Sequence, residues 1–164
     1  MKVFGFAGWS GSGKTTVIEQ LIPRFMRAGL TVSLIKHAHH SFDIDQPGKD
    51  SYRHRAAGSK EVLVSSEKRW VIMHELQGDA EPGLDALMKR LSPCDLLLVE
   101  GYKRYPMPKL EIYRGANGKP LLHPEDPTIV AIAADVPLET ELPRFRLDDY
   151  DRIAEFILVH NGFK

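Results

Sequence analysis

One stretch near the start of the chain has residue types at a spacing that could bind phosphate. Residues 8–15 have the sequence GWSGSGKT and match the pattern G-x-x-x-x-G-K-[ST] without a gap. Glycines allow the backbone to approach a phosphate chain where a Cβ atom would collide. The amides of such a loop and of the helix N-terminus after it attract anions. The pattern therefore predicts a loop that binds the phosphates of a nucleoside triphosphate.

Two side chains of this loop have specific expected roles. Lys14 is expected to reach the β- and γ-phosphates, and the Thr15 hydroxyl is expected to bind Mg²⁺. The predicted nucleotide-binding residues of the segment lie on the loop or in the first turn after it, and they are Gly8, Ser10, Gly11, Ser12, Gly13, Lys14, Thr15 and Thr16.

The segments around the loop predict the elements that position it. An apolar run at residues 3–7 predicts a buried strand, and apolar residues at helical spacing predict a helix from Lys14 to about Ala28. Pro23 is expected to kink that helix or to split off its last turn. Residues 30–36 predict a second strand, and a strand–helix–strand unit of this length predicts a parallel pair with a right-handed crossover.

A second informative segment ends in an acidic residue. Residues 96–99 are four consecutive aliphatics, which predict a strand buried on both faces in the middle of the sheet. Glu100 follows them, at the edge of the sheet that the phosphate loop also occupies. We therefore predict that Glu100 orders Mg²⁺ or a catalytic water, so that the predicted catalytic residues are Lys14 and Glu100.

A long polar loop is predicted at residues 36–50, at the same edge of the sheet, where ligands bind in open parallel sheets. We favour an interpretation in which its basic side chains meet phosphate and Asp43 or Asp45 supports Mg²⁺ or its water. Two alternatives are a transition-metal site formed by the histidines and a solvated polar loop. The side chains predicted to meet phosphate in this loop and in the segment after it are Lys36, His37, His39, His40, Lys49 and Arg53.

Asp135 ends a predicted strand at residues 128–135 and is a candidate base contact. An aspartate in this place can accept hydrogen bonds from guanine N1 and N2, a donor pair that adenine lacks. The alternative is a strand-end turn residue before Pro137, and the N-K-x-D guanine pattern is absent.

The other segments predict further elements of an α/β fold. We expect strands at 61–66 and 70–75, a short helix at 50–58, a helix with Leu84 to Leu91 at core spacing, a half-exposed strand at 109–114, a loop at 115–127, and a last helix capped by Asp148 or Asp149. We predict a three-layer P-loop NTPase-like fold with a mostly parallel central sheet, in a single domain over residues 1–164.

The composition excludes several classes of protein. The 22 basic residues balance the 22 acidic ones, so the chain as a whole has no signal for binding nucleic acid. The single cysteine excludes a disulfide within the chain. No apolar run is long enough to span a membrane, and the first strand leaves no room for a secretory signal, so we expect a cytoplasmic protein.

Four segments occur in a fixed order in this short chain: the phosphate loop, KHAHH at 36–40, DSYR at 50–53 and LVEGYK at 98–103. Together they resemble the MobB family of molybdopterin-guanine dinucleotide biosynthesis adaptor proteins. The resemblance implies binding of GTP with Mg²⁺, weak GTP hydrolysis and a homodimer. It further implies that the loop from His37 to Lys49 lines a groove for nucleotide or cofactor phosphates. It also implies three kinds of partner: a MobA-like guanylyltransferase that attaches GMP to molybdopterin, molybdoenzyme assembly proteins, and molybdopterin or its dinucleotide.

Other functions share these patterns. A small-molecule kinase would use the same phosphate loop, with arginines such as Arg53, Arg55 and Arg104 near the acceptor. A metal-delivery GTPase would use the histidines of the polar loop. A third hypothesis is an adaptor without enzymatic activity, in which nucleotide only changes the affinity for a partner.

Overall fold

The computed structural model describes residues 1–38 and 42–164. The chain divides into two compact units, one formed by residues 1–37 with 87–164 and the other by residues 38–86. The prediction of a single domain over the whole chain stays a prediction.

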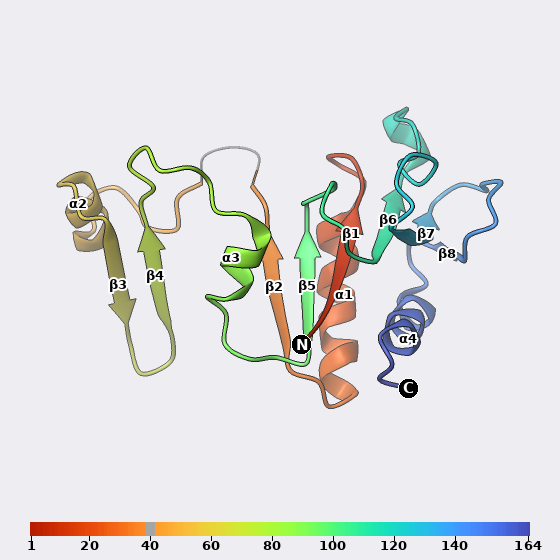
Figure 1. Cartoon of the computed structure of the whole chain (residues 1–164), viewed down its shortest axis with the longest axis horizontal. Helices are drawn as coiled ribbons and strands as arrows, with labels where there is room; N and C mark the ends of the chain where they lie inside the picture. The colour runs from red at the N-terminus through yellow and green to blue at the C-terminus, as the bar shows by residue number, and fades with distance from the viewer. Residues whose placement is uncertain (39–41) are drawn as a thin grey trace. The chain divides into compact units, whose positions relative to one another are not determined.

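The first unit is built on a six-stranded sheet with the strand order β2-β5-β1-β6-β7-β8 (Figure 1). Every neighbouring pair in it is parallel, which confirms the predicted α/β fold with a parallel central sheet. The three-residue strand β8 was not predicted. The strands are β1 (Lys2–Ala7), β2 (Val32–Lys36), β5 (Leu96–Glu100), β6 (Lys109–Tyr113), β7 (Ile129–Ala134) and β8 (Arg144–Arg146).

Two helices of the first unit pack against each other along the sheet. They are α1 (Lys14–Arg27) and α4 (Tyr150–His160). Helix α1 runs through Pro23 without a break, so the predicted split is wrong. Asp149 does occupy the N-cap position of α4, but its carboxylate accepts a bond from Arg152 at 3.1 Å instead of capping the helix.

One predicted helix is shorter than its periodicity suggested. Helix α3 covers only Leu84–Met88, and the next residues form turns in which Arg90 N donates to Leu87 O and Leu91 N donates to Met88 O. Pro93 follows closely, and a proline disfavours helical geometry in the residue before it. The apolar spacing up to Leu91 therefore does not correspond to a longer helix.

The hydrophobic core of this unit lies between the sheet and the two helices. Alternate strand residues such as Phe4, Phe6 and Leu98 pack with Leu21 and Ile157 from the helices. The opposite face of β5 is also buried, because Leu97 and Val99 have no exposed surface. The prediction of a central strand buried on both faces is confirmed.

Strand β6 is predicted correctly, but its predicted exposure is wrong. Lys109 and Glu111 are buried on the sheet face opposite the helices, with 1% and 0% of their surfaces exposed. Both charges have partners from the segment after the strand: Lys109 Nζ lies 3.0 Å from Asp126, and Glu111 accepts backbone bonds from Leu122 and His123 at 2.7 and 3.0 Å. Alternation of polar and apolar residues therefore does not indicate a solvated face here.

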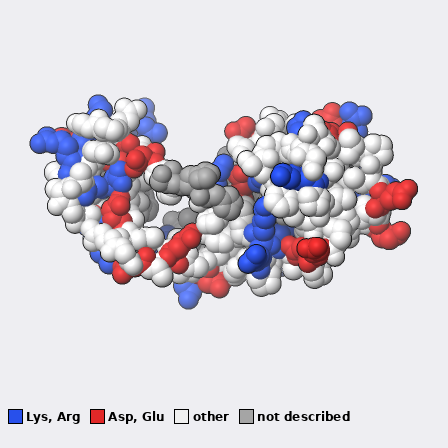
Figure 2. All heavy atoms as spheres, turned by 90° about the horizontal axis from the view of Figure 1, so that it is seen from above, with Lys and Arg blue, Asp and Glu red and all other residues white. Residues whose placement is uncertain are grey.

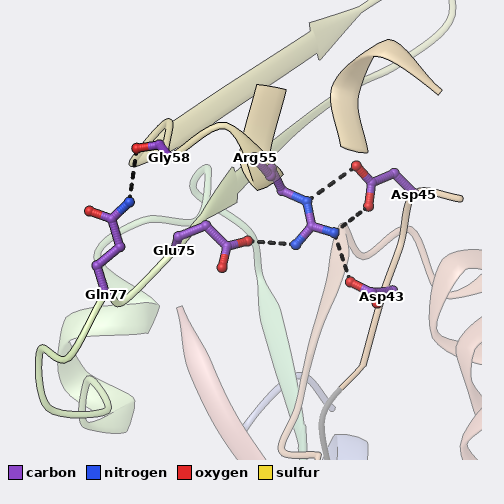
Figure 3. Close-up of polar contacts among 6 residues, drawn as sticks. All are labelled: Asp43, Asp45, Arg55, Gly58, Glu75 and Gln77. Carbon is purple, nitrogen blue, oxygen red and sulfur yellow. Dashed lines mark hydrogen bonds and ion pairs between the residues drawn. The ribbon is translucent and has the colours of Figure 1, made fainter. Parts of the chain in front are cut away.

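The second unit contains a helix and an antiparallel hairpin. Helix α2 (Asp50–Ala56) precedes β3 (Glu61–Ser65) and β4 (Trp70–His74), which form a separate two-stranded sheet. The guanidinium of Arg55, on α2, forms ion pairs with Asp43 at 2.8 Å, Asp45 at 2.6 Å and Glu75 at 2.6 Å (Figure 3). These three hydrogen-bonded carboxylates raise the pKa of Arg55.

Two properties of the described surface bear on possible partners. Lys and Arg side chains are interspersed with Asp and Glu on the face that Figure 2 shows. Within the described residues, no helix has both the length and the apolar character needed to cross a membrane.

Candidate functional site

The predicted phosphate loop joins the end of β1 to the start of α1, and two of its glycines are sterically required. A Cβ on Gly8 would stand 2.4 Å from the carbonyl oxygen of Ile112, and Gly8 has a φ of +148°. Gly13 is the N-cap residue of α1 and has a φ of +96°. Because residues with a Cβ atom rarely adopt these backbone conformations, the glycine spacing of the loop has a direct structural cause.

Lys14 is folded over its own loop. Its ammonium donates to the carbonyl oxygens of Gly8 and Trp9, both at 2.9 Å. Burial lowers the pKa of Lys14, the nearby Glu100 carboxylate opposes this effect, and Lys103 and Lys36 lower the pKa further. A phosphate bound beside the ammonium would stabilise its charged form.

A carboxylate, a hydroxyl and an ammonium meet beside this loop. Thr15 Oγ1 lies 3.3 Å from Glu100 Oε1, and Lys36 Nζ lies 3.3 Å from Glu100 Oε2 and 3.4 Å from Thr15 Oγ1. The strand register places Lys36 and Phe6 level with Glu100. Hydroxyl and carboxylate oxygens are the ligands that Mg²⁺ prefers, so Thr15 and Glu100 fit the predicted metal. Lys36 is a cation in direct contact with these oxygens.

This arrangement predicts that Lys36 competes with a divalent cation. Lys36→Met removes an ammonium from Glu100 while keeping an unbranched apolar side chain of similar length. Because Lys36 is half exposed, the gain is limited to about 1 kcal/mol, or about fivefold tighter binding of the cation. Titration with Mn²⁺ followed by electron paramagnetic resonance measures it. Lys2→Met, which removes an exposed ammonium at the start of β1, is the matched control. Unchanged or weaker Mn²⁺ binding by Lys36→Met would contradict the prediction.

Two further residues of the loop, Ser12 and Trp9, differ in their contacts. Ser12 is buried and its hydroxyl has no hydrogen-bond partner among the described residues, which is uncommon in the absence of a ligand or water. The phosphate-loop pattern assigned no role to Trp9. Its indole donates to Pro120 O at 2.8 Å, and the ammonium groups of Lys103 and Lys119 lie 4.2 and 6.0 Å from its ring centre.

The other side of the loop faces strands β6 and β7. Asp135 follows β7, and its Oδ1 accepts a bond from the backbone nitrogen of Gly115 at 2.8 Å. Gly115 begins the short 3₁₀ helix η1 (Gly115–Asn117), and Asn117 donates to the carbonyl oxygen of Ser10 in the phosphate loop at 3.4 Å. A cleft of about 810 Å³ opens here, and its lining includes Arg114, Asp135, Arg146, Tyr150 and Arg152.

The residues predicted in the polar loop have different positions. Lys36 belongs to the group around Glu100, and the backbone nitrogen of His37 donates to the carbonyl oxygen of Glu100 at 2.9 Å. His39 and His40 lie outside the described residues. Among the described residues, no group of three or more His, Cys, Asp and Glu side chains could hold a metal ion.

Three predicted residues belong to the second unit. Asp43 is paired with Arg55, Lys49 is the N-cap residue of α2, and the exposed Arg53 lies 3.8 Å from Asp50. Their predicted roles toward phosphate and Mg²⁺ stay predictions.

The parallel sheet, and the glycine loop between its strand β1 and helix α1, define an α/β protein of the P-loop NTPase-like class. Residues 3–135 match the family described as molybdopterin guanine dinucleotide synthesis protein B, MobB. The chain belongs to the MobB family, as its sequence patterns predicted.

Proteins of known name agree with this assignment. The molybdopterin-guanine dinucleotide biosynthesis adapter protein of Escherichia coli strain K12 is 40% identical over 159 residues, which cover 95% of this chain and 91% of that protein. The adapter protein of Haemophilus influenzae is also 40% identical, over 94% of this chain and 86% of that protein. A crystal structure of molybdopterin-guanine biosynthesis protein B has a TM-score of 0.78 at 26% identity, covering 98% of this chain and 99% of that one. A MobB homologue from Bacillus stearothermophilus, at 24% identity and a TM-score of 0.75 over the full length of both chains, supports the fold.

Proposed function

We propose that this protein binds GTP with Mg²⁺ at the phosphate loop, hydrolyses it slowly, and acts as an adapter when GMP is attached to molybdopterin. The observation on which this depends is the meeting of Thr15, Glu100 and Lys14 at one glycine loop. Membership of the MobB family and the names of the relatives support the pathway.

The loop would bind the triphosphate by exchanging partners. Lys14 would transfer its two hydrogen bonds from the carbonyl oxygens of Gly8 and Trp9 to the β- and γ-phosphates. Thr15 and Glu100 would hold Mg²⁺, which neutralises charge on those phosphates. Lys36 would then move from Glu100 toward the γ-phosphate. This assigns Glu100 to the metal and leaves no assigned base for the attacking water, so we expect slow hydrolysis.

We propose that the nucleoside lies in the cleft beside β7. Oδ2 of Asp135 has a contact to Arg114 of 3.8 Å, which is longer than a normal hydrogen bond, so this oxygen can accept from guanine N1 or N2. The 810 Å³ volume lies within the usual range for small-molecule sites, about 300–1,000 Å³. Guanine preference and the base contact at Asp135 are parts of the proposal.

We further propose that the protein is a cytoplasmic homodimer that works with a MobA-like guanylyltransferase and with molybdopterin or its dinucleotide. The hairpin supports an interaction between proteins. Leu63, Trp70 and Ile72 lie on the same face of the β3–β4 sheet and are 59%, 64% and 45% exposed. Exposed apolar side chains gathered on one face indicate an interaction surface.

A reconstituted reaction tests the adapter role. Purified guanylyltransferase, molybdopterin and GTP are mixed with or without this protein, and the dinucleotide formed is measured by mass spectrometry. We expect a higher yield with the wild-type protein and a lower one with Glu100→Ala, which removes the proposed metal ligand. Equal yields with and without the wild-type protein would contradict the adapter role.

A further inference from the structure

Arg114 lies directly against the phosphate loop, although no sequence pattern marked it. It follows the last residue of β6, and its Nη2 lies 3.3 Å from the point where a Cβ on Gly13 would stand. Its side chain is 43% exposed. The guanidinium is therefore beside the loop that would bind phosphate and remains accessible to a ligand.

Asp135 lies beside this arginine and carries the opposite charge. One oxygen of its carboxylate accepts the backbone bond from Gly115, the residue after Arg114, and the other lies 3.8 Å from Arg114 Nη1. At 3.8 Å the carboxylate attracts the guanidinium by charge without a short hydrogen bond, so the same oxygen can also accept a bond from a base. Because a guanidinium has five N–H donors, Arg114 keeps donors for an anionic oxygen.

The order of the strands shows which part of a nucleotide Arg114 would face. Strands β5 and β6 lie on opposite sides of β1, which leads into the loop. Glu100 at the end of β5 stands with Thr15 on the metal side, so that side receives the β- and γ-phosphates. Arg114 comes from the β6 side and also lines the 810 Å³ cleft. It therefore stands between the phosphate loop and the space proposed for the nucleoside.

We propose that Arg114 is a phosphate-binding residue that contacts the α-phosphate of the bound nucleotide, and that Asp135 is the residue that positions it. This inference rests on the proposed function. An arginine presents two parallel donors to phosphate oxygens, which gives a stronger and more directional contact than the point charge of a lysine. The contact needs only the α-phosphate, so GMP, GDP and GTP all depend on it.

Intrinsic fluorescence offers a direct test. The chain has two tryptophans, of which Trp9 lies in the phosphate loop and Trp70 lies on the hairpin. Trp70→Phe therefore leaves Trp9 as the reporter of ligand binding. In this background the Kd values of GMP, GDP and GTP are measured with Mg²⁺ at several salt concentrations, for the parent protein and for Arg114→Ala, Arg114→Lys and Asp135→Asn. Arg27→Ala, in the last turn of α1, is the matched control.

We expect Arg114→Ala to raise the Kd values of GMP, GDP and GTP by similar factors of about 10 to 100. We also expect it to reduce the dependence of Kd on salt. Arg114→Lys is expected to restore part of the affinity. Asp135→Asn keeps an acceptor for Gly115 and removes the charge beside Arg114, so we expect its Kd for GMP to rise and its salt dependence to change as well. Arg27→Ala is expected to bind like the parent protein.

Two results would overturn the inference. One is Arg114→Ala with parental affinity for all three nucleotides, and the other is a loss confined to GTP, which would place the arginine at the γ-phosphate. Circular dichroism confirms that each variant is folded, and Arg114→Lys repeats the test with a charged side chain. If the parent protein binds none of the nucleotides, the proposed function itself fails, and this result differs from normal binding by Arg114→Ala.

Discussion

Lys14→Ala is expected to raise the Kd for GTP by at least about 100-fold. The variant loses an ammonium that would donate to two phosphates, and hydrogen bonds to charged groups contribute about 1.5–3 kcal/mol each, with about 1.4 kcal/mol per factor of ten. In the structure this ammonium is already at the loop, bonded to the carbonyl oxygens of Gly8 and Trp9. Binding of GMP is expected to change much less, because Lys14 faces the β- and γ-phosphates.

Isothermal titration calorimetry with GTP and GMP measures this difference. Lys2→Ala is the matched control, because Lys2 is an exposed lysine at the start of β1, and the other end of β1 leads into the phosphate loop. Thermal unfolding of both variants establishes that they are folded. Parental GTP affinity in Lys14→Ala would show that the glycine loop is not the triphosphate site.

Glu111→Ala is expected to lower the free energy of unfolding by about 3–5 kcal/mol. The side chain of Glu111 has no exposed surface and accepts backbone bonds from Leu122 and His123. Its removal leaves two backbone donors without their acceptor and opens a cavity beside buried strand β6. A buried donor left without an acceptor costs about 1–3 kcal/mol, and two donors are left here.

Urea unfolding measures the change in free energy. In a chain of this length the melting temperature falls by about 2–4 °C per kcal/mol, so we also expect a drop of about 10 °C. Glu125→Ala, which removes an exposed carboxylate of the same segment, is the matched control. Glu111→Gln keeps one acceptor oxygen, so we expect a smaller decrease in its free energy of unfolding. A Glu111→Ala protein as stable as Glu125→Ala would contradict the assigned role.

The metal side of the candidate site could be predicted from the sequence. A glycine loop after a strand has local causes for its shape, which the geometry of Gly8 and Gly13 illustrates. Glu100 and Lys36 could be located because the carboxyl ends of parallel strands meet at one edge of the sheet, and the register places these two residues level with each other.

The nucleoside side could not be predicted in the same way. Arg114 has a place in the site only because β6 lies next to β1, and sequence order does not determine that adjacency. The Trp9 indole donates a hydrogen bond to Pro120, which is 111 residues away along the chain. The burial of Lys109 and Glu111 likewise depends on partners supplied by a segment that sequence patterns describe only as a loop. In the sequence, buried polar residues whose partners are distant along the chain have the same pattern as surface residues. Only the fold shows that their partners lie next to them.

The most direct test of GTP binding at this loop is a calorimetric titration of the wild-type protein with GTP and with ATP, each with Mg²⁺. We predict one GTP per chain, a clear preference for GTP over ATP, and loss of that preference in Asp135→Ala. Equal or tighter binding of ATP would contradict the guanine assignment and favour a kinase, and no binding of either nucleotide would contradict the proposed site.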